Sequence, residues 1–521
     1  MTYIKAQRTP HFIFFAVFGI TSLFIVMYYL STTIIQYTTT HQFPINSLTR
    51  YPLSIPIFLV ELFSFGFAAY FLYNLFTDRY RPKTPKPLKN KPAVAFCIPV
   101  FNEPKDTVER TLKACTKVNW PDKKIYLLDD SNNDQHKKDM QDLSKKYGAI
   151  LVRRPDNTGF KAGNINHAVA KAIQEEYFVI LDSDQAPEKA FLQVTMDYFS
   201  DPDVFFVQTP QYYINDDTPL RRAAKIGTNI FYQTQCISKA RDGALPFCGT
   251  NVIARTEMFR QIGGFSYYTS TEDIDLGLRA NRRGWYGVFV PEVLVKGYAP
   301  PDWSAYVTQQ YRWANGNLAI LREGLGKLAW GPHSFLHQMH TFFTVGWWLI
   351  GVATLIYILV PLISVLTGMP THHMWLTNFV LGLLYVNVMV GIMMIFVALN
   401  SRTEDDKVTL FDAFLQYSLI TNSLFVYTRA AINALFRRYA GFVRTSKVEA
   451  RSGLWDIKWN LLLALVCFLV SVFALYNVAI ASDTQQVRTY LPISVWLLFY
   501  AVVLTSSILF VGKASQTGVR A

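Results

Sequence analysis

Charged residues are scarce in this chain of 521 residues, where Asp, Glu, Lys and Arg together make up 17%. Soluble proteins usually contain about a quarter. Cysteine is also scarce, with five in the whole sequence and no metal-ligand spacing such as C-x-x-C. The sequence therefore argues against a disulfide scaffold and a zinc site, and it indicates reduced thiols in a cytosolic setting.

Apolar residues take the place of charge, since 51% of the chain is hydrophobic and 15% aromatic. A membrane-spanning helix needs about 20 apolar residues. Runs of that order occupy residues 12–35, 55–76, 335–366, 375–399, 454–480 and 491–511. The net charge of +13 comes largely from basic residues beside these runs, a distribution that favours cytosolic loops and phosphate-bearing ligands over nucleic acid. We predict about six transmembrane helices in a plasma (inner) membrane, with both termini and the soluble part in the cytosol.

These runs divide the chain into segments of different character. We expect two spans in 1–78, a basic proline-rich linker in 79–92, a soluble domain in 93–330, two spans in 331–400, an interface segment and a loop in 401–453, and two spans in 454–521. Polar residues interrupt residues 411–436, so we expect that segment to lie along the membrane surface.

The soluble part alternates apolar strands with helices. The pattern predicts strands at 93–99, 124–129, 149–153 and 177–181, a helix to about 117 and another beginning near Gly163. This order indicates an α/β fold with a mostly parallel sheet. Ligands of such sheets bind beyond the carboxyl ends of the strands, where the sequence places two acidic pairs, Asp129-Asp130 and Asp182-x-Asp184.

Asp182-x-Asp184 has the chemistry of a cation site, because carboxylate oxygens suit Mg²⁺ or Mn²⁺. A helix cap or a solvated turn would use the same residues. Lys161 lies before the predicted helix start, where it could face a diphosphate, although an exposed surface lysine is an equally simple interpretation.

The stretch from Ser270 to Asn317 combines three chemical tools. Asp273 can accept a proton, Arg312 can hold a diphosphate, and Trp313 can carry a sugar ring. Between them, Gly284 and Pro291 bracket a predicted strand. The alternatives are a carboxylate that stabilises a helix start and an amphipathic helix that binds lipid headgroups.

Six motifs follow one another along the chain: Pro99-x-x-Asn102-Glu103, Asp129-Asp130, Lys161-Ala162-Gly163, Asp182-x-Asp184, Thr271-Glu272-Asp273 and Gln309-x-x-Arg312-Trp313. In this order the sequence resembles the processive family 2 glycosyltransferases, most closely the cellulose synthase branch. The resemblance covers about residues 93–325 strongly and the membrane layout more loosely. It implies a cytosolic domain of the GT-A type joined to a helical membrane domain.

The resemblance also implies roles for individual residues. A nucleotide sugar would contact Phe101, Glu103, Asp129, Asp130, Lys161, Asp182, Gln309 and Arg312. A metal ion, Mg²⁺ or Mn²⁺, would bind Asp184 and Asp182. Asp273, beside Glu272, would be the general base, and the acceptor sugar would contact Trp313, Cys248, Gly249 and Thr250. A gating loop would include Phe442, Thr445 and Lys447, although Arg444 stands where the family usually has valine.

The implied function is an inverting, processive hexosyltransferase that polymerises UDP-glucose into a β-linked, cellulose-like glucan and moves it across the lipid bilayer. Close alternatives are a β-mannan, a β-1,3-glucan or an N-acetylglucosamine polymer. A non-processive glycolipid transferase and an inactive transporter or scaffold are more distant ones. Since the chain ends shortly after its last apolar run, we expect no cyclic-di-GMP-binding domain after it.

Overall fold

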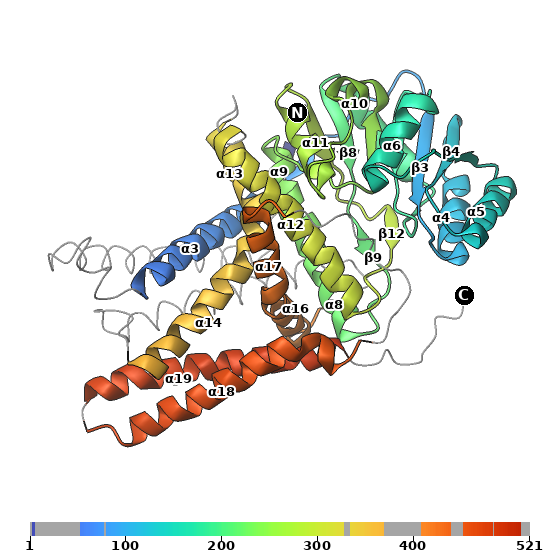
Figure 1. The fold of residues 1–521 in the computed structure, drawn as a ribbon. Helices are drawn as coiled ribbons and strands as arrows, with labels where there is room; N and C mark the ends of the chain where they lie inside the picture. The colour runs from blue at the N-terminus through green and yellow to red at the C-terminus, as the bar shows by residue number, and fades with distance from the viewer. Residues whose placement is uncertain are drawn as a thin grey trace.

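The computed structural model describes residues 3–5, 53–77, 80–327, 334–368, 408–438, 452–482 and 484–511. These residues form an α/β domain and a group of long helices, seen at the upper right and lower left of Figure 1. The long helix α12 (Trp303–Lys327) lies between the two parts.

A seven-stranded sheet with the order β11-β8-β10-β6-β3-β4-β5 forms the centre of the α/β domain. Its strands are β3 (Val94–Val100), β4 (Lys123–Asp129), β5 (Ile150–Val152), β6 (Tyr177–Ile180), β8 (Val204–Gln208), β10 (Val252–Arg255) and β11 (Tyr286–Phe289). Every neighbouring pair is parallel except the two that involve β10, which is antiparallel to β6 and to β8. The predicted strands and the mostly parallel sheet are therefore confirmed, with one reversed strand added.

Helices cover both faces of this sheet. Successive side chains of β3 alternate, so that Phe96 and Ile98 pack in one apolar cluster while Ala95 and Cys97 pack in the other. The first cluster includes α4 (Lys105–Lys117), α5 (Asp134–Tyr147) and α7 (Phe191–Thr195); the second includes α6 (Phe160–Lys171), α10 (Thr256–Ile262) and α11 (Glu272–Asn281).

The expected helix start near Gly163 is wrong, because α6 begins at Phe160. The residue that caps it is Gly159, whose φ of 73° lies in the left-handed region that glycine adopts readily. Lys161 consequently lies inside the first turn of the helix, not before it.

Short elements complete the domain and its border. A three-stranded sheet contains β7 (Ala186–Pro187), β12 (Val295–Gly297) and β9 (Tyr212–Tyr213), and β1 (Tyr3–Lys5) pairs with β2 (Tyr80–Pro82). The helical segments are η1 (Met196–Ser200), α8 (Pro219–Ile230), the π-helix η2 (Phe231–Cys236) and α9 (Ile237–Arg241).

Apolar helices and short 3₁₀ turns that adjoin them make up most of the second part. The helices are α3 (Ser54–Thr77), α13 (Phe335–Gly346), α14 (Ile350–Thr367), α18 (Lys458–Ala479) and α19 (Thr484–Thr505), and the turns are η3 (Trp347–Leu349), η4 (Leu454–Ile457) and η5 (Ser506–Phe510). Buried residues of four of them, Ile57, Tyr357, Cys467 and Leu497, belong to one cluster.

Among the residues that the structure describes, three stretches are long and apolar enough to cross a membrane: Phe335–Thr367, Leu454–Ala479 and Tyr490–Phe510. They match three of the predicted spans. The predicted span at 55–76 is a helix whose apolar stretch, Leu59–Phe71, is shorter. The predicted spans at 12–35 and 375–399 lie outside the described residues.

The segment predicted to lie along the membrane surface forms two helices, α16 (Leu410–Asn422) and α17 (Leu424–Leu435). Its polar side chains make contacts within the protein. Asp412 Oδ1 lies 3.1 Å from Arg222 Nε, and Asn422 donates to the carbonyl of Val503 at 2.9 Å. An interface position remains a prediction, but two of the polar residues that suggested it, Asp412 and Asn422, have partners within the protein.

Candidate active site

A cavity of about 500 Å³ lies at the carboxyl edge of the sheet. Its wall combines the segments that follow β3, β4 and β6, the turn before β10, the start of α11 and the middle of α12. Most of the predicted site residues line it: Phe101, Glu103, Asp130, Lys161, Asp182, Cys248, Gly249, Thr250, Glu272, Asp273, Gln309, Arg312 and Trp313.

Cys248-Gly249-Thr250 reaches this edge because β10 runs against its neighbours. Because β10 is antiparallel to its neighbours, it begins at the edge where the parallel strands end. The turn before β10 therefore lies beside the turns that follow β3, β4 and β6, and the motif precedes a strand. Thr250 Oγ1 accepts a hydrogen bond from Asp182 N at 3.0 Å. Gly249 has a φ of 68°, and a Cβ there would lie 2.6 Å from Asp273 Oδ2. Only glycine fits between the motif and this carboxylate.

The segment before α11 is held against α12 by a close backbone approach. Ser270 Oγ donates to the carbonyl of Arg312 at 2.8 Å, and Thr269 Oγ1 donates to the carbonyl of Gly316 at 2.9 Å. A Cβ on Gly316 would lie 2.7 Å from Ser270 Oγ. These contacts bring Asp273 and Arg312, which are distant in sequence, to one wall of the cavity.

Asp273 and Glu272 form a partly buried acidic pair. Burial, aided by the charge of Asp273, raises the pKa of Glu272 to about 7. Burial also raises the pKa of Asp273, against the opposing influence of the Ile274 N–H, which donates to Oδ1 at 2.9 Å, and of Lys161 and Arg312. A carboxylate with a raised pKa beside two cations is suited to accept a proton inside a cavity.

Lys161 joins the two sides of the cavity. Its Nζ lies 2.5 Å from Asp182 Oδ1 and donates to the carbonyl of Gly249 at 2.9 Å. Because it lies in the first turn of α6, its ammonium lies at the end of the helix where the helix dipole favours an anion.

The acidic pair after β4 is bound by two arginines that the sequence reasoning missed. Arg154 holds Asp130 through two bonds, Nε to Oδ1 at 2.8 Å and Nη2 to Oδ2 at 2.6 Å. Arg153 Nε lies 2.8 Å from Asp129 Oδ2. Asp129 is 3% exposed and does not line the cavity, so its expected contact with a nucleotide is not supported, whereas Asp130 does line it. The signal available in the sequence was a pair of arginines at the end of a predicted strand, Arg153 as its last residue and Arg154 directly after it.

The expected metal ligands lie at two depths. Asp182 lines the cavity, whereas Asp184 is 1% exposed and is not part of the lining. Among the described residues, no group of three or more His, Cys, Asp or Glu side chains could hold a metal by itself. This donor set still fits Mg²⁺ or Mn²⁺, which take one or two carboxylates and complete their shell with water and substrate phosphates. Asp182 faces the cavity directly, and metal binding by Asp184 and Asp182 stays a prediction.

Other predictions fall beyond the cavity. Phe442, Thr445 and Lys447 of the expected gating loop lie outside the described residues. Several lining residues belong to no motif, among them Gln211 and Tyr298. The ring of Tyr298 lies 4.5 Å from the guanidinium carbon of Arg110. Nothing in the local sequence marks these residues.

A family model described as "Glycosyltransferase like family 2" matches residues 92–316, the part of the chain that builds this cavity. Residues 92–316 are therefore similar to a family 2 glycosyltransferase domain. The expected resemblance to the cellulose synthase branch is confirmed by curated relatives. The cellulose synthase 1 catalytic subunit [UDP-forming] of Komagataeibacter xylinus is 31% identical over 294 residues, which cover 53% of this chain and 38% of that protein.

Two further proteins extend the comparison. The cellulose synthase catalytic subunit [UDP-forming] of Pseudomonas fluorescens (strain SBW25) is 31% identical over 308 residues, covering 56% of this chain and 40% of that protein. The glycosyltransferase chain thus spans well under half the length of these relatives. A solved mannosyltransferase, PcManGT from Pyrobaculum calidifontis in complex with GDP-Man and Mn2+, superposes with a TM-score of 0.54 at 16% identity, over 74% of this chain and 100% of that one. It supports the GT-A-like fold of the domain.

Proposed function

We propose that this glycosyltransferase is a processive, inverting enzyme that polymerises UDP-glucose into a β-linked, cellulose-like glucan. The observation that carries the proposal is the meeting of Asp273, Gly249, Arg312 and Trp313 with the donor-side residues Lys161 and Asp182 in one cavity. A base, two cations, an aromatic ring and a carboxylate suited to a metal are the groups that glycosyl transfer from a nucleotide sugar requires.

In the proposed reaction, the acceptor hydroxyl oxygen attacks C1 of the glucose from the face opposite UDP. The C1–O bond to the diphosphate breaks with its electron pair, and the configuration at C1 inverts from α to β. Asp273 takes the hydroxyl proton as the new bond forms, a role that contributes about 10²–10⁴-fold in typical enzymes. Lys161 and Arg312 stabilise the negative charge that collects on the leaving diphosphate.

A divalent ion would be held by Asp182 with Asp184 behind it, and when bound it would neutralise part of the diphosphate charge. Trp313 offers an indole face to the acceptor sugar. Two tryptophans of the apolar helices pack against other aromatic rings: Trp347 lies edge-on to Phe67 at 5.6 Å, and Trp348 lies edge-on to Tyr427 at 5.3 Å.

We further propose that the chain sits in the plasma (inner) membrane with this domain in the cytosol, and that the apolar helices carry the product across. In support, α18 exposes a broad apolar face, in which Leu465, Leu469 and Val472 are 53%, 55% and 49% exposed. Such a face matches lipid better than water.

The test is to offer the purified protein UDP-glucose, GDP-mannose and UDP-N-acetylglucosamine separately with Mg²⁺ or Mn²⁺. Polymer that forms is digested with linkage-specific glycosidases. Polymer from UDP-glucose that a β-1,4-glucanase degrades supports the proposal, whereas polymer from GDP-mannose alone would assign the mannan alternative. Products extended by a single sugar would refute processivity. In proteoliposomes, polymer protected from external glucanase would establish transport.

A further inference from the structure

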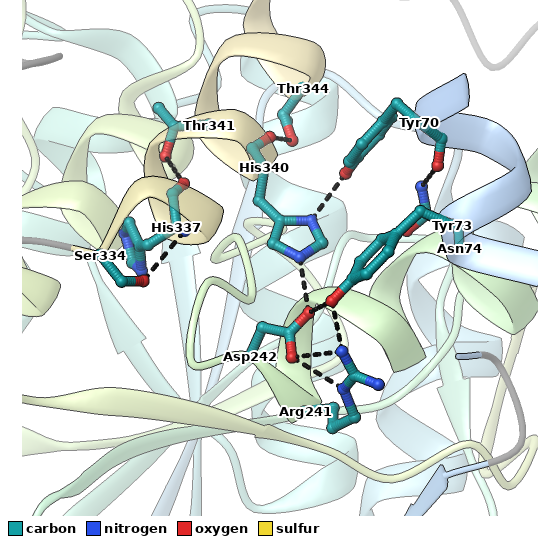
Figure 2. A network of polar contacts seen from close by, with 10 residues as sticks. All are labelled: Tyr70, Tyr73, Asn74, Arg241, Asp242, Ser334, His337, His340, Thr341 and Thr344. Carbon is teal, nitrogen blue, oxygen red and sulfur yellow. Dashed lines mark hydrogen bonds and ion pairs between the residues drawn. The ribbon is translucent and has the colours of Figure 1, made fainter. Parts of the chain in front are cut away.

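A polar cluster outside the cavity joins the glycosyltransferase domain to two apolar helices. We call it the clasp; it consists of Tyr70, Tyr73, Arg241, Asp242 and His340 (Figure 2). The tyrosines belong to α3, Arg241 ends α9, and His340 belongs to α13. Three segments that are far apart in sequence therefore meet at one carboxylate.

Each ring nitrogen of His340 has a partner, and the ring is 0% exposed. Nδ1 lies 2.8 Å from the hydroxyl of Tyr70, and Nε2 lies 2.8 Å from Asp242 Oδ2. These partners suit a neutral imidazole that accepts from Tyr70 and donates from Nε2 to Asp242. A buried polar network with every member satisfied fixes the relative position of the segments that contribute to it.

Asp242 is the centre of the clasp. Its Oδ2 also accepts from the hydroxyl of Tyr73 at 2.6 Å, and its Oδ1 accepts from Arg241 Nε at 2.7 Å. Arg241 donates in turn to the hydroxyl of Tyr73. Removing one partner of such a network leaves buried polar groups without hydrogen bonds. The loss of folding free energy is then larger than the average contribution of a hydrogen bond to stability.

A short connection leads from Asp242 to Cys248-Gly249-Thr250, the motif expected to contact the acceptor sugar. Between them, Leu245 and Phe247 are buried in the sheet's second apolar cluster, which leaves this short connection little freedom. It ends at Gly249, whose carbonyl accepts from Lys161 and whose α-carbon packs against Asp273. On the other side, α13 packs against α12, the helix that carries Arg312 and Trp313.

From this placement we infer that Asp242 and His340 are positioning residues that hold the acceptor side of the cavity in a fixed position relative to the apolar helices. The inference rests on the proposed function, and it adds a group of residues outside the cavity on which transfer to the acceptor depends. Misplacing a reacting group by about 1 Å can cost about 10²-fold in rate. Donor binding uses mainly the turns after β3, β4 and β6 and the start of α6, so it should depend on the clasp much less than transfer does, although Arg312 contributes to both.

The test compares Asp242→Asn, His340→Ala and His340→Gln in the full-length protein with wild type. We expect Asp242→Asn and His340→Ala to lower sugar incorporation about 10- to 100-fold with a much smaller change in the UDP dissociation constant. We also expect more UDP released per sugar incorporated, since water replaces a misplaced acceptor. His340→Gln retains a donor near the position of Nε2 and should recover part of the loss.

A matched control is Glu109→Gln. Glu109 Oε1 likewise accepts from a tyrosine, Tyr147 at 2.8 Å, and pairs with Lys146, but it lies on α4 away from the cavity. It should change none of these values. Unchanged incorporation and unchanged coupling in the clasp variants would overturn the inference, and so would a loss of UDP affinity equal to the loss of incorporation.

A second measurement does not depend on activity. Amide hydrogen exchange of residues 243–250 should become faster in Asp242→Asn and stay unchanged in Glu109→Gln. Wild-type protein that forms no polymer from any of the three nucleotide sugars would count against the proposed function alone. Unchanged exchange at residues 243–250 would count against the clasp whether or not the protein is active.

Discussion

Replacement of Asp273 by asparagine tests the proposed chemistry most directly. The change keeps the shape of the side chain and removes its capacity to take a proton. A general base contributes about 10²–10⁴-fold, which corresponds to about 2.7–5.4 kcal/mol of transition-state stabilisation. We expect the rate of polymer formation to decrease by a factor within this range. UDP binding should persist, because Lys161 and the residues after β3 and β4 are unchanged.

The neighbouring carboxylate of Glu272 determines how large the loss of rate in Asp273→Asn should be. Glu272 also lines the cavity, and part of the increase in its pKa to about 7 comes from the charge of Asp273. In Asp273→Asn that charge is absent, so a larger fraction of Glu272 is ionised at neutral pH and can accept a proton from a less suitable position. We therefore expect the single variant to lose about 10²–10³-fold, and the double variant with Glu272→Gln to lose more.

The assay is the initial rate of incorporation of radiolabelled glucose, with the UDP dissociation constant measured on the same preparations. Glu272→Gln alone serves as the matched control and should lose less than about 10-fold. If Asp273→Asn retained more than about one tenth of the wild-type rate with unchanged UDP affinity, Asp273 would not be the base.

Three other predictions address separate parts of the site. Gly249→Ala should lower activity by more than about 10-fold, because its Cβ would lie 2.6 Å from Asp273 Oδ2 at a φ of 68°; steady-state rates check this, and wild-type activity would contradict it. Chelation of divalent ions, or Asp182→Asn, should abolish incorporation, and added Mn²⁺ or Mg²⁺ should restore only the chelated wild type. Folding raises the pKa of Glu272 to about 7, so its contribution to stability is present below its ordinary pKa of about 4.5 and is lost as the pH rises through 7. The fall in melting temperature between pH 5 and 8 should accordingly be smaller in Glu272→Gln, and an identical pH profile would show that this carboxylate does not titrate as described.

The sequence predicted those parts of the structure that depend on local pattern. Continuous apolar runs marked β3, β4, β5 and β6, and the acidic or polar residues that follow them lie at the ligand edge because parallel strands share their carboxyl ends. The motifs and the family resemblance that they carry predicted most of the cavity lining. These motifs lie at strand ends, in the first turns of α6 and α11, and in the middle of α12.

Features that depend on pairing between distant segments could not be predicted in this way. The apolar residues of β10 are the same whichever way the strand runs, so its reversal left no local signal. Arg154 pairs with Asp130, and His340 pairs with Asp242, only when folding brings these distant segments together. Asp412 and Asn422 resembled a membrane-surface pattern because the sequence does not show that their partners, Arg222 and Val503, lie within the protein.

Because β10 is reversed, the residues proposed to bind the acceptor come largely from other parts of the sequence than the residues proposed to bind the nucleotide sugar. Under the proposed function, most groups for the nucleotide sugar come from the turns after β3, β4 and β6 and from the start of α6, whereas groups for the acceptor come from the turn before β10 and from α12, whose Arg312 serves both. Changes in the turns after β3, β4 and β6 can therefore alter which sugar is accepted without moving the residues that receive it. Under the proposed function, sugar preference and product export can therefore diverge independently.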